Sequence, residues 1–163
     1  MRIFRFASLT AAALLVAVGP AGAATVSDNL EVQAYVEASC SVTGALLDFG
    51  TYDPIGTNAT ADLDAQADIA VTCTATHPAT ITLGEGVNHD GTLRRMGNGT
   101  HFLTYALFQD AGRTTEWGSG AGTEVSYVGS GMTENLTVYG RVHGGQNVSS
   151  GAYLDTVTVT VTF

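Results

Sequence analysis

Two cysteines, Cys40 and Cys73, are the residues best able to form a covalent link in this chain of 163 residues. They are 33 positions apart, and an even number of cysteines in an oxidising compartment indicates a disulfide. In the chain-entropy model, closing a loop of that size stabilises a fold by roughly 4 kcal/mol. The alternative is a two-cysteine metal site, but His77 is the only histidine near either cysteine, which does not meet the ligand spacing of zinc sites.

The other side chains with chemical potential do not form a recognised catalytic or metal-binding motif. The four histidines are His77, His89, His101 and His143. They lack the spacing of paired metal ligands. Asp62, Asp64 and Asp68 could hold calcium, but they lack the glycine and glutamate of an EF-hand, and a solvated acidic loop is the alternative. Ser119 and Ser130 lie outside any Gly-x-Ser-x-Gly elbow. We expect a protein that is not an enzyme, with no metal and no cofactor.

The N-terminus has the pattern of a removable signal peptide. Arg2 and Arg5 supply the positive region, and residues 7–18 form an apolar run that is too short to span a bilayer. Gly19-Pro20 ends this run, and Ala21-Gly22-Ala23 gives the small-residue pattern before a cleavage site. We therefore predict that residues 1–23 are a signal peptide and that the mature chain is exported; cleavage after Ala24 is the alternative.

The predicted mature chain is strongly acidic. Four arginines remain after removal of residues 1–23, against fifteen carboxylates, so that its formal net charge is −11. Repulsion from phosphate groups at this charge argues against nucleic acid and anionic lipid as partners.

The rest of the chain alternates between apolar and polar residues with a period of two, which is typical of β-strands. The expected strands are residues 45–52, 69–75, 79–83, 102–109, 124–128, 135–143 and 156–163. Turns rich in glycine separate them, and such a succession of short strands predicts a β-sandwich. Only residues 59–67 have a composition that allows a short helical turn. Trp117, in a glycine-rich stretch, is either an exposed adhesive residue or part of the packed interior.

A further alternating segment precedes Cys40 and lies outside the predicted disulfide loop. In residues 29–38, apolar side chains occupy every second position: Leu30, Val32, Ala34 and Val36. This is the pattern of a half-buried strand. The pattern alone leaves two destinations open, either the first strand of the same sandwich or a strand that inserts elsewhere.

Five segments together resemble the spore coat protein U domain, the subunit family of archaic Csu-type chaperone–usher pili. They are Val36-Glu-Ala-Ser-Cys40-Ser-Val42, Asp48-Phe49-Gly50, Ile69-Ala-Val71-Thr-Cys73, the Asp-x-x-Arg turn in residues 105–113, and the closing Gly-x-Tyr-x-Asp and alternating strand of residues 151–163. They occur in the order of the family and cover nearly the whole predicted mature chain.

The resemblance implies an all-β, immunoglobulin-like sandwich of six strands that is incomplete because it lacks its last strand. Donor-strand exchange would complete it, with residues 24–37 of one copy inserting into the sandwich formed by residues 38–163 of another. The donor side chains would be Leu30, Val32, Ala34 and Val36. The C-terminal strand at the edge of the groove, which would also pair with a chaperone, would contribute Val157, Val159, Val161 and Phe163.

The implied function is that of a structural pilus subunit, major or minor, that polymerises and supports adhesion and biofilm formation. Its implied partners are neighbouring subunits, a periplasmic chaperone that is expected to hold the terminal carboxylate, and an outer-membrane usher. It would cross the periplasm and reach the cell surface. The alternative is a soluble secreted binding module in which residues 30–36 close the chain's own sandwich.

Overall fold

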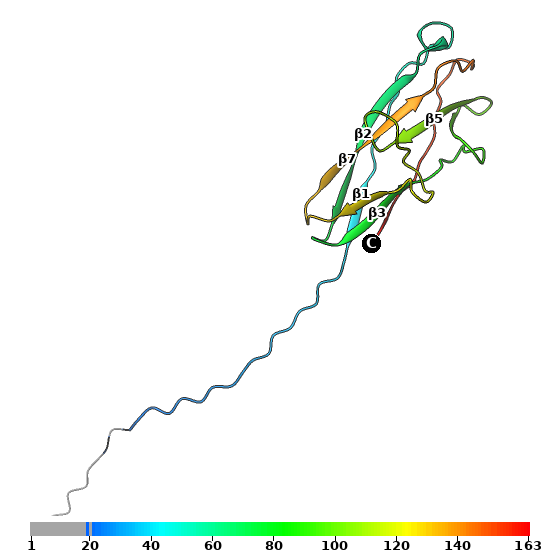
Figure 1. Ribbon diagram of the computed structural model, residues 1–163. Coiled ribbons are helices and arrows are strands. Elements are labelled where there is room, and N and C mark those ends of the chain that lie inside the picture. The colour runs from blue at the N-terminus through cyan, green and yellow to red at the C-terminus, as the bar shows by residue number, and fades with distance from the viewer. Residues whose placement is uncertain (1–18, 20) are drawn as a thin grey trace, which may run out of the picture. The chain divides into compact units, whose positions relative to one another are not determined.

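The chain forms short strands joined by loops, and the prediction of an all-β fold is confirmed. The computed structural model describes residue 19 and residues 21–163 (Figure 1), so that the predicted signal peptide, residues 1–23, lies almost entirely outside the described residues. The strands are β1 (Cys40–Thr43), β2 (Leu63–Cys73), β3 (Pro78–Leu83), β4 (Arg94–Gly97), β5 (Phe102–Phe108), β6 (Val125–Val128), β7 (Glu134–Val142) and β8 (Val159–Thr162). In the described part of the chain, the helical structure is one 3-10 turn, η1 (Thr57–Ala59), and no helix is long and apolar enough to cross a membrane.

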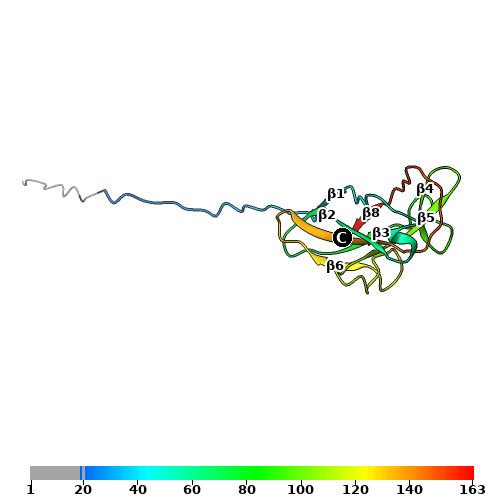
Figure 2. The ribbon, with the colours of Figure 1, turned by 90° about the horizontal axis from the view of Figure 1, so that it is seen from above.

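The strands form two antiparallel sheets. One sheet has the order β1-β2-β7-β5-β4, and the other has the order β6-β3-β8. Figure 2 shows β3, β6 and β8 of the smaller sheet together with strands of the larger one. The side chains that face inward from both sheets make one hydrophobic core, as expected for a sandwich.

The core follows from the alternation of the strands. In β2, Ile69, Val71 and Cys73 are buried, while the residues between them are partly exposed. The same period-two burial occurs in β3, β5 and β7. Trp117 is 1 % exposed, and its indole N–H donates to the carbonyl of Ile81 at 3.0 Å. Trp117 is therefore a core residue and not an exposed adhesive one.

Several sequence-based boundaries are wrong. Residues 45–52 form no strand, because β1 pairs with β2 only over four residues. The segment 59–67 is not a helical turn: η1 ends at Ala59 and β2 begins at Leu63, because residues 63–67 continue the alternation into the sheet. β8 covers only Val159–Thr162, because β3 ends at Leu83, the partner of Val159, and Thr156 and Thr158 bond to the loop that follows β3. The eight strands exceed the six that the resemblance implies, and β4 is not among the runs expected from the sequence, since two arginines interrupt its apolar pattern.

Cys40 and Cys73 form a disulfide. They lie directly opposite one another in the ladder between β1 and β2. The bond therefore fastens the short first strand to the longest strand of the larger sheet.

Candidate functional site

The two sheets have neighbouring edges, and a groove lies along them. β1 is an edge strand of the larger sheet, and β8 is an edge strand of the smaller one. These two edge strands contact each other (Figure 2). We call residues 40–49 the first wall of the groove and residues 153–163 its second wall. Neither wall has a strand paired on its groove side within the described sandwich.

The two walls run in opposite directions. β1 begins opposite the end of β2, and β8 ends opposite the beginning of β3, and the short loop 74–77 joins these points. This is the Cys40 end of the groove. At the other end, Phe49 of the first wall and Tyr153 of the second wall line the same cavity. We call this the Tyr153 end.

Among the described residues, the backbone of the second wall before β8 bonds on one side only, to β4 and to the loop that follows β3. The bonds join Leu154 with Gly97, the Thr156 carbonyl with the Val87 N–H, and the Thr158 carbonyl with the Gly84 N–H. In an extended chain, the backbone groups of alternate residues face opposite edges. Those of Asp155, Val157 and Val159 therefore face the groove, where they are available to an added strand.

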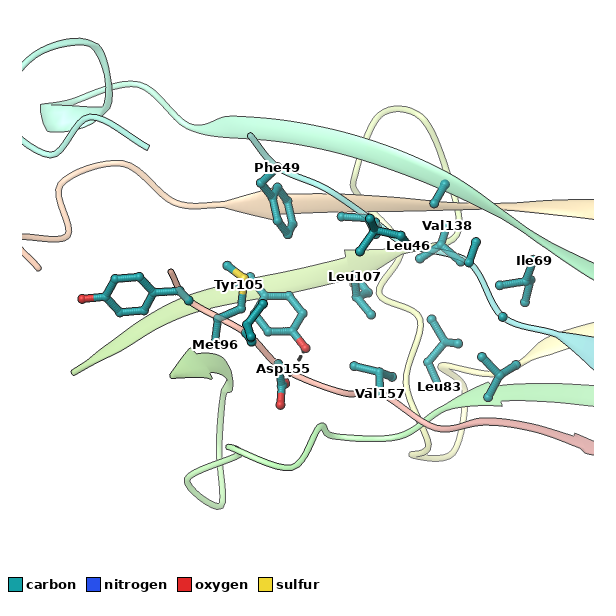
Figure 3. Close-up of a pocket in the computed structure, with 17 residues that line it drawn as sticks. Leu46, Phe49, Ile69, Leu83, Met96, Tyr105, Leu107, Val138, Asp155 and Val157 are labelled. Atoms are coloured by element: carbon teal, nitrogen blue, oxygen red, sulfur yellow. Dashed lines mark hydrogen bonds between the residues drawn. The ribbon is translucent and has the colours of Figure 1, made fainter. Parts of the chain in front are cut away.

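The groove is hollow and mainly apolar. One cavity of about 230 Å³ lies between the walls (Figure 3), and its floor is made by Ile69, Leu83, Leu107 and Val138. A second cavity of about 570 Å³ continues it toward the Tyr153 end. The two cavities share Phe49, Met96 and Tyr153 among their lining residues. Leaving apolar surface of this kind in water is unfavourable by about 25 cal/mol for each Å². A segment that covers the groove would therefore stabilise the sandwich.

The predicted residues of the C-terminal strand lie at two different places. Val157 and Val159 line the groove, and Val161 is half-buried against the core. Phe163 is 53 % exposed, and its ring lies edge-on to His77 with 6.4 Å between the centroids. Phe163 thus lies at the Cys40 end and is not part of the cavity lining.

The predicted donor residues are exposed. Leu30 is 87 % exposed, Val32 86 % and Val36 78 %, and Ala34 is exposed as well. No residue from 21 to 39 belongs to a helix or strand. The segment therefore carries a row of apolar side chains with no assigned strand partner, and its role as a donor remains a prediction.

Sequence reasoning missed a polar pair inside the groove. The Tyr105 hydroxyl donates to the Asp155 carboxylate at 2.6 Å, and burial together with this bond raises the pKa of Tyr105. The same carboxylate accepts from the backbone N–H of Asn88 at 3.1 Å. Gly86 leaves room for it, since a Cβ there would collide with the Asp155 carboxylate. The closing Gly-x-Tyr-x-Asp motif contains Asp155, but its tyrosine is Tyr153, so the motif gives no signal for the partner Tyr105.

The Asp-x-x-Arg turn also has a structural role. Arg113 takes a left-handed conformation with φ of 54°. Its guanidinium donates to the carbonyls of Gly140 in β7, at 3.0 Å, and Ala65 in β2, at 3.2 Å. The turn is thereby anchored across two neighbouring strands of the larger sheet.

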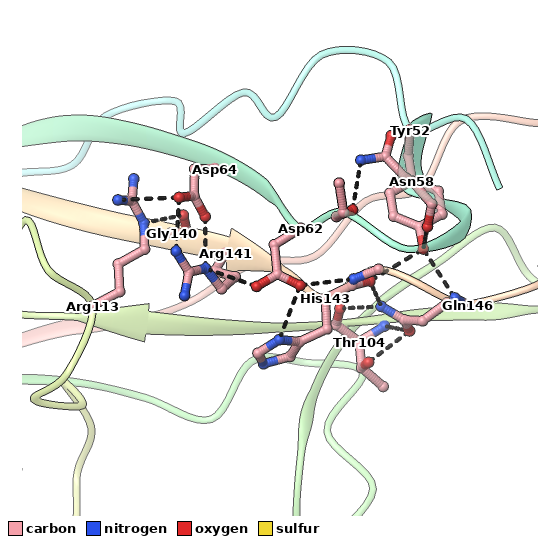
Figure 4. Close-up of polar contacts among 12 residues, drawn as sticks. Tyr52, Asn58, Asp62, Asp64, Thr104, Arg113, Gly140, Arg141, His143 and Gln146 are labelled. Atoms are coloured by element: carbon pink, nitrogen blue, oxygen red, sulfur yellow. Dashed lines mark hydrogen bonds and ion pairs between the residues drawn. The ribbon is translucent and has the colours of Figure 1, made fainter. Parts of the chain in front are cut away.

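The three aspartates considered for calcium do not converge on one point. Asp64 accepts two hydrogen bonds from Arg141, at 2.7 and 2.8 Å (Figure 4). Asp62 lies 3.3 Å from Arg141, and Asp68 accepts from Thr137 at 2.6 Å. Among the described residues, no group of three histidines, cysteines or carboxylates is placed to hold a metal ion.

The Asp64–Arg141 pair predicts a pH-dependent contribution to stability. The hydrogen bonds from Arg141 hold the pKa of Asp64 below its usual 3.8. A lowered carboxyl pKa contributes stability above the unfolded value, and this contribution is lost as the pH falls through the folded value. Because Asp64 is 37 % exposed, we expect Asp64→Asn to cost at most about 1 kcal/mol at pH 7. Unfolding in urea from pH 7 to pH 2 should show this difference shrinking below pH 4, and Arg141→Gln should show the same trend. A difference that stays constant with pH would contradict the assignment.

The two serines between glycines have ordinary structural contacts. Ser119 donates to Glu85 at 2.8 Å, and the Ser130 hydroxyl accepts from the N–H of Met132 at 3.3 Å. The groove, by contrast, combines an apolar lining with unpaired strand edges, which are the features that allow an extended apolar peptide to add as a strand.

Comparison with known proteins identifies the family. A sequence profile of the spore coat protein U domain matches residues 26–160. Protein U of Myxococcus xanthus is 43 % identical over 171 aligned positions, which cover 96 % of each chain. The chain belongs to the spore coat protein U domain family.

Solved structures place this spore coat protein U domain among pilus-subunit folds. One is the complex of the chaperone CsuC with the tip adhesion subunit CsuE of the archaic chaperone–usher Csu pili of Acinetobacter baumannii. The matched chain of this complex is 25 % identical to the present one, with a TM-score of 0.59. The match covers 78 % of the present chain but only 40 % of the matched chain. Another is the P pilus rod subunit PapA, with a TM-score of 0.55 and 18 % identity over 76 % of this chain and 97 % of that one. This last likeness concerns the fold alone.

Proposed function

We propose that the chain is a structural subunit of a surface pilus that polymerises by donor-strand complementation and supports adhesion and biofilm formation. The observation that carries the proposal is a groove between two unpaired strand edges, in a chain that also has an exposed, alternating apolar segment. A strand added to the groove would pair its backbone with the second wall and place every second side chain over the apolar floor. Burying three aliphatic side chains in this way contributes on the order of 5–8 kcal/mol.

The direction of the walls favours a neighbouring copy as the donor. A donor strand that runs from the Cys40 end to the Tyr153 end is antiparallel to the second wall. Its own sandwich then follows beyond the Tyr153 end, which leaves the N-terminal segment of the acceptor free at the Cys40 end for the next joint. Subunits joined in this way form a linear chain with one polarity.

The chain's own segment would have to run the opposite way. Only residues 37–39 separate Val36 from β1, so a segment that folds back would form a hairpin with β1. It would then run parallel to the second wall and occupy the groove from the Tyr153 end to the Cys40 end. The self-complemented binding module and the pilus subunit therefore differ in the direction of the inserted strand.

The proposed partners follow from the same groove. Before assembly, its unpaired edges and apolar floor call for a temporary occupant, and the likeness to a chaperone-bound pilus subunit supports a periplasmic chaperone in this role. We assign delivery to the cell surface to an outer-membrane usher. The donor side chains would be Leu30, Val32, Ala34 and Val36, and the second wall would contribute Val157, Val159 and Val161.

The test compares residues 24–163 with a variant that lacks residues 24–37, both refolded without a chaperone and followed by gel filtration. We expect the longer chain to form a series of oligomers and the shortened chain to remain unjoined. When the two are mixed, the N-terminal segment of the longer chain should insert into the groove of the shortened chain, which then acts only as an acceptor. A longer chain that stays monomeric would overturn the proposal. Loss of stability of this monomer on deletion would favour the self-complemented module.

A further inference from the structure

The groove consists of two chemically different sections. Toward the Cys40 end, the floor is aliphatic and formed by Ile69, Leu83, Leu107 and Val138 (Figure 3). Toward the Tyr153 end, Phe49, Tyr105 and Asp155 come together. The Phe49 and Tyr105 ring centroids are 6.2 Å apart, and the Tyr105 hydroxyl lies 2.6 Å from the Asp155 carboxylate.

The Tyr105–Asp155 pair is held firmly in this position. Tyr105 is 7 % exposed, and Asp155 is bound by both the backbone and the side-chain nitrogen of Asn88, at 3.1 and 3.2 Å. The pair cannot easily move aside for a large side chain. A bulky aliphatic group placed over the carboxylate would also remove water from it without supplying a hydrogen bond, which is unfavourable.

The apolar row of the N-terminal segment has one small member. Leu30, Val32 and Val36 are branched aliphatic residues, whereas Ala34 contributes only a methyl group. Building on the proposed function, we propose that Ala34 of one copy lies over the Tyr105–Asp155 pair of the next and thereby fixes the register of the joint. Val32 then lies beside Val157.

The rest of the row fits this register. Residues directly opposite one another in an antiparallel pair share a face and advance in opposite directions along the chain. Leu30 therefore lies beside Val159, over the aliphatic section, and Val36 lies beside Tyr153, at the larger cavity. Leu30 and Val32 therefore cover the aliphatic floor, and the methyl group of Ala34 covers the polar section. If the inserted strand ran in the opposite direction, Leu30 would lie toward the Tyr153 end and Val36 toward the Cys40 end, and the bulky residues would no longer match the aliphatic floor.

Cysteine cross-linking tests the register directly. Gln33 faces away from the groove and in this register lies opposite Thr156. The backbone of Thr156 bonds to Val87, on the side away from the groove. Toward the donor strand, Thr156 and Gln33 therefore form a non-hydrogen-bonded pair, whose Cα atoms are about 4.5 Å apart. This distance is within the range of a disulfide. We expect full-length chains with Gln33→Cys and Thr156→Cys to form covalent multimers on oxidation. Gln33→Cys with Thr158→Cys, or with Leu154→Cys, should not, and each single variant is a control.

Every outcome of this experiment decides between alternatives. Multimers cross-linked through residue 158 or 154 would overturn the register and leave the pilus proposal intact. Polymers that form but cross-link at none of the three positions would also overturn it. A cross-link within one chain, or no polymer at all, would contradict the proposed function itself.

A substitution of Ala34 tests the physical cause. Ala34→Leu should slow the joining of subunits by at least about tenfold, because overpacking a filled site is unfavourable. Val36→Leu is the matched control, since it adds bulk at the larger cavity, and it should change the rate by less than about threefold. Both residues lie outside the strands of the sandwich, so the fold is unaffected. Equal effects of the two substitutions would overturn the role of Ala34.

Discussion

Replacing Val32 by aspartate is expected to abolish the joining of subunits while leaving the sandwich folded and its complex with a chaperone intact. Val32 is 86 % exposed, so the substitution removes no core contact. In the proposed joint it would place a carboxylate over Leu107 and beside Val157, and none of the described residues that line this cavity is a cation. An uncompensated buried charge costs about 3–5 kcal/mol, which corresponds to a loss of roughly a thousandfold in affinity.

The control for this substitution is Gln33→Asp, which adds the same charge to the next residue. Gln33 faces away from the groove in the proposed joint, so joining should fall by less than tenfold, about 1 kcal/mol at an exposed site. Joining is measured by gel filtration of refolded chains, and chaperone binding by co-purification. Val36→Asp provides a second test on the inward face. If Val32→Asp weakened chaperone binding as much as joining, residues 30–36 would not be the donor strand.

The fold class could be predicted because period-two alternation is a local property of the sequence. The C-terminal run shows this clearly: Val157, Val159 and Val161 are all half-buried toward the interior, and the threonines between them are exposed. The two cysteines were likewise informative because of their number and the expected compartment. Where a feature depends on a residue and its near neighbours, the sequence was a sufficient guide.

The groove itself could not be predicted from local patterns. Its floor brings together residues from β2, β3, β5 and β7, whose proximity is determined by the sheet order and not by spacing along the chain. The same reason explains the error over residues 45–52. Their alternating pattern is that of a strand, but a strand also needs a partner, and this segment borders the open groove. The Tyr105–Asp155 bond joins residues that are 50 positions apart, so no local pattern indicates it.

Because β1 is a short edge strand beside the groove, the disulfide has more importance than its position at the edge suggests. β1 has four residues and pairs with β2 on one side only. Its ladder therefore provides few hydrogen bonds to hold the first wall. The covalent bond to Cys73, which is 1 % exposed, therefore keeps the first wall in place beside the groove.

Cys40→Ser is therefore expected to lower the free energy of unfolding by about 4 kcal/mol, because the chain-entropy contribution of a loop of 33 residues is lost. The yield of folded subunit should fall accordingly, since small domains have only about 5–15 kcal/mol of stability in total. Unfolding in guanidinium, with and without reductant, measures the effect: reduced wild-type protein should resemble the variant. Ser41→Ala, on the next residue of β1, is the control and should unfold like the wild type. A wild-type midpoint that is indifferent to reductant would show that the bond does not stabilise the subunit, and the first wall would then have to be held by the β1–β2 ladder alone.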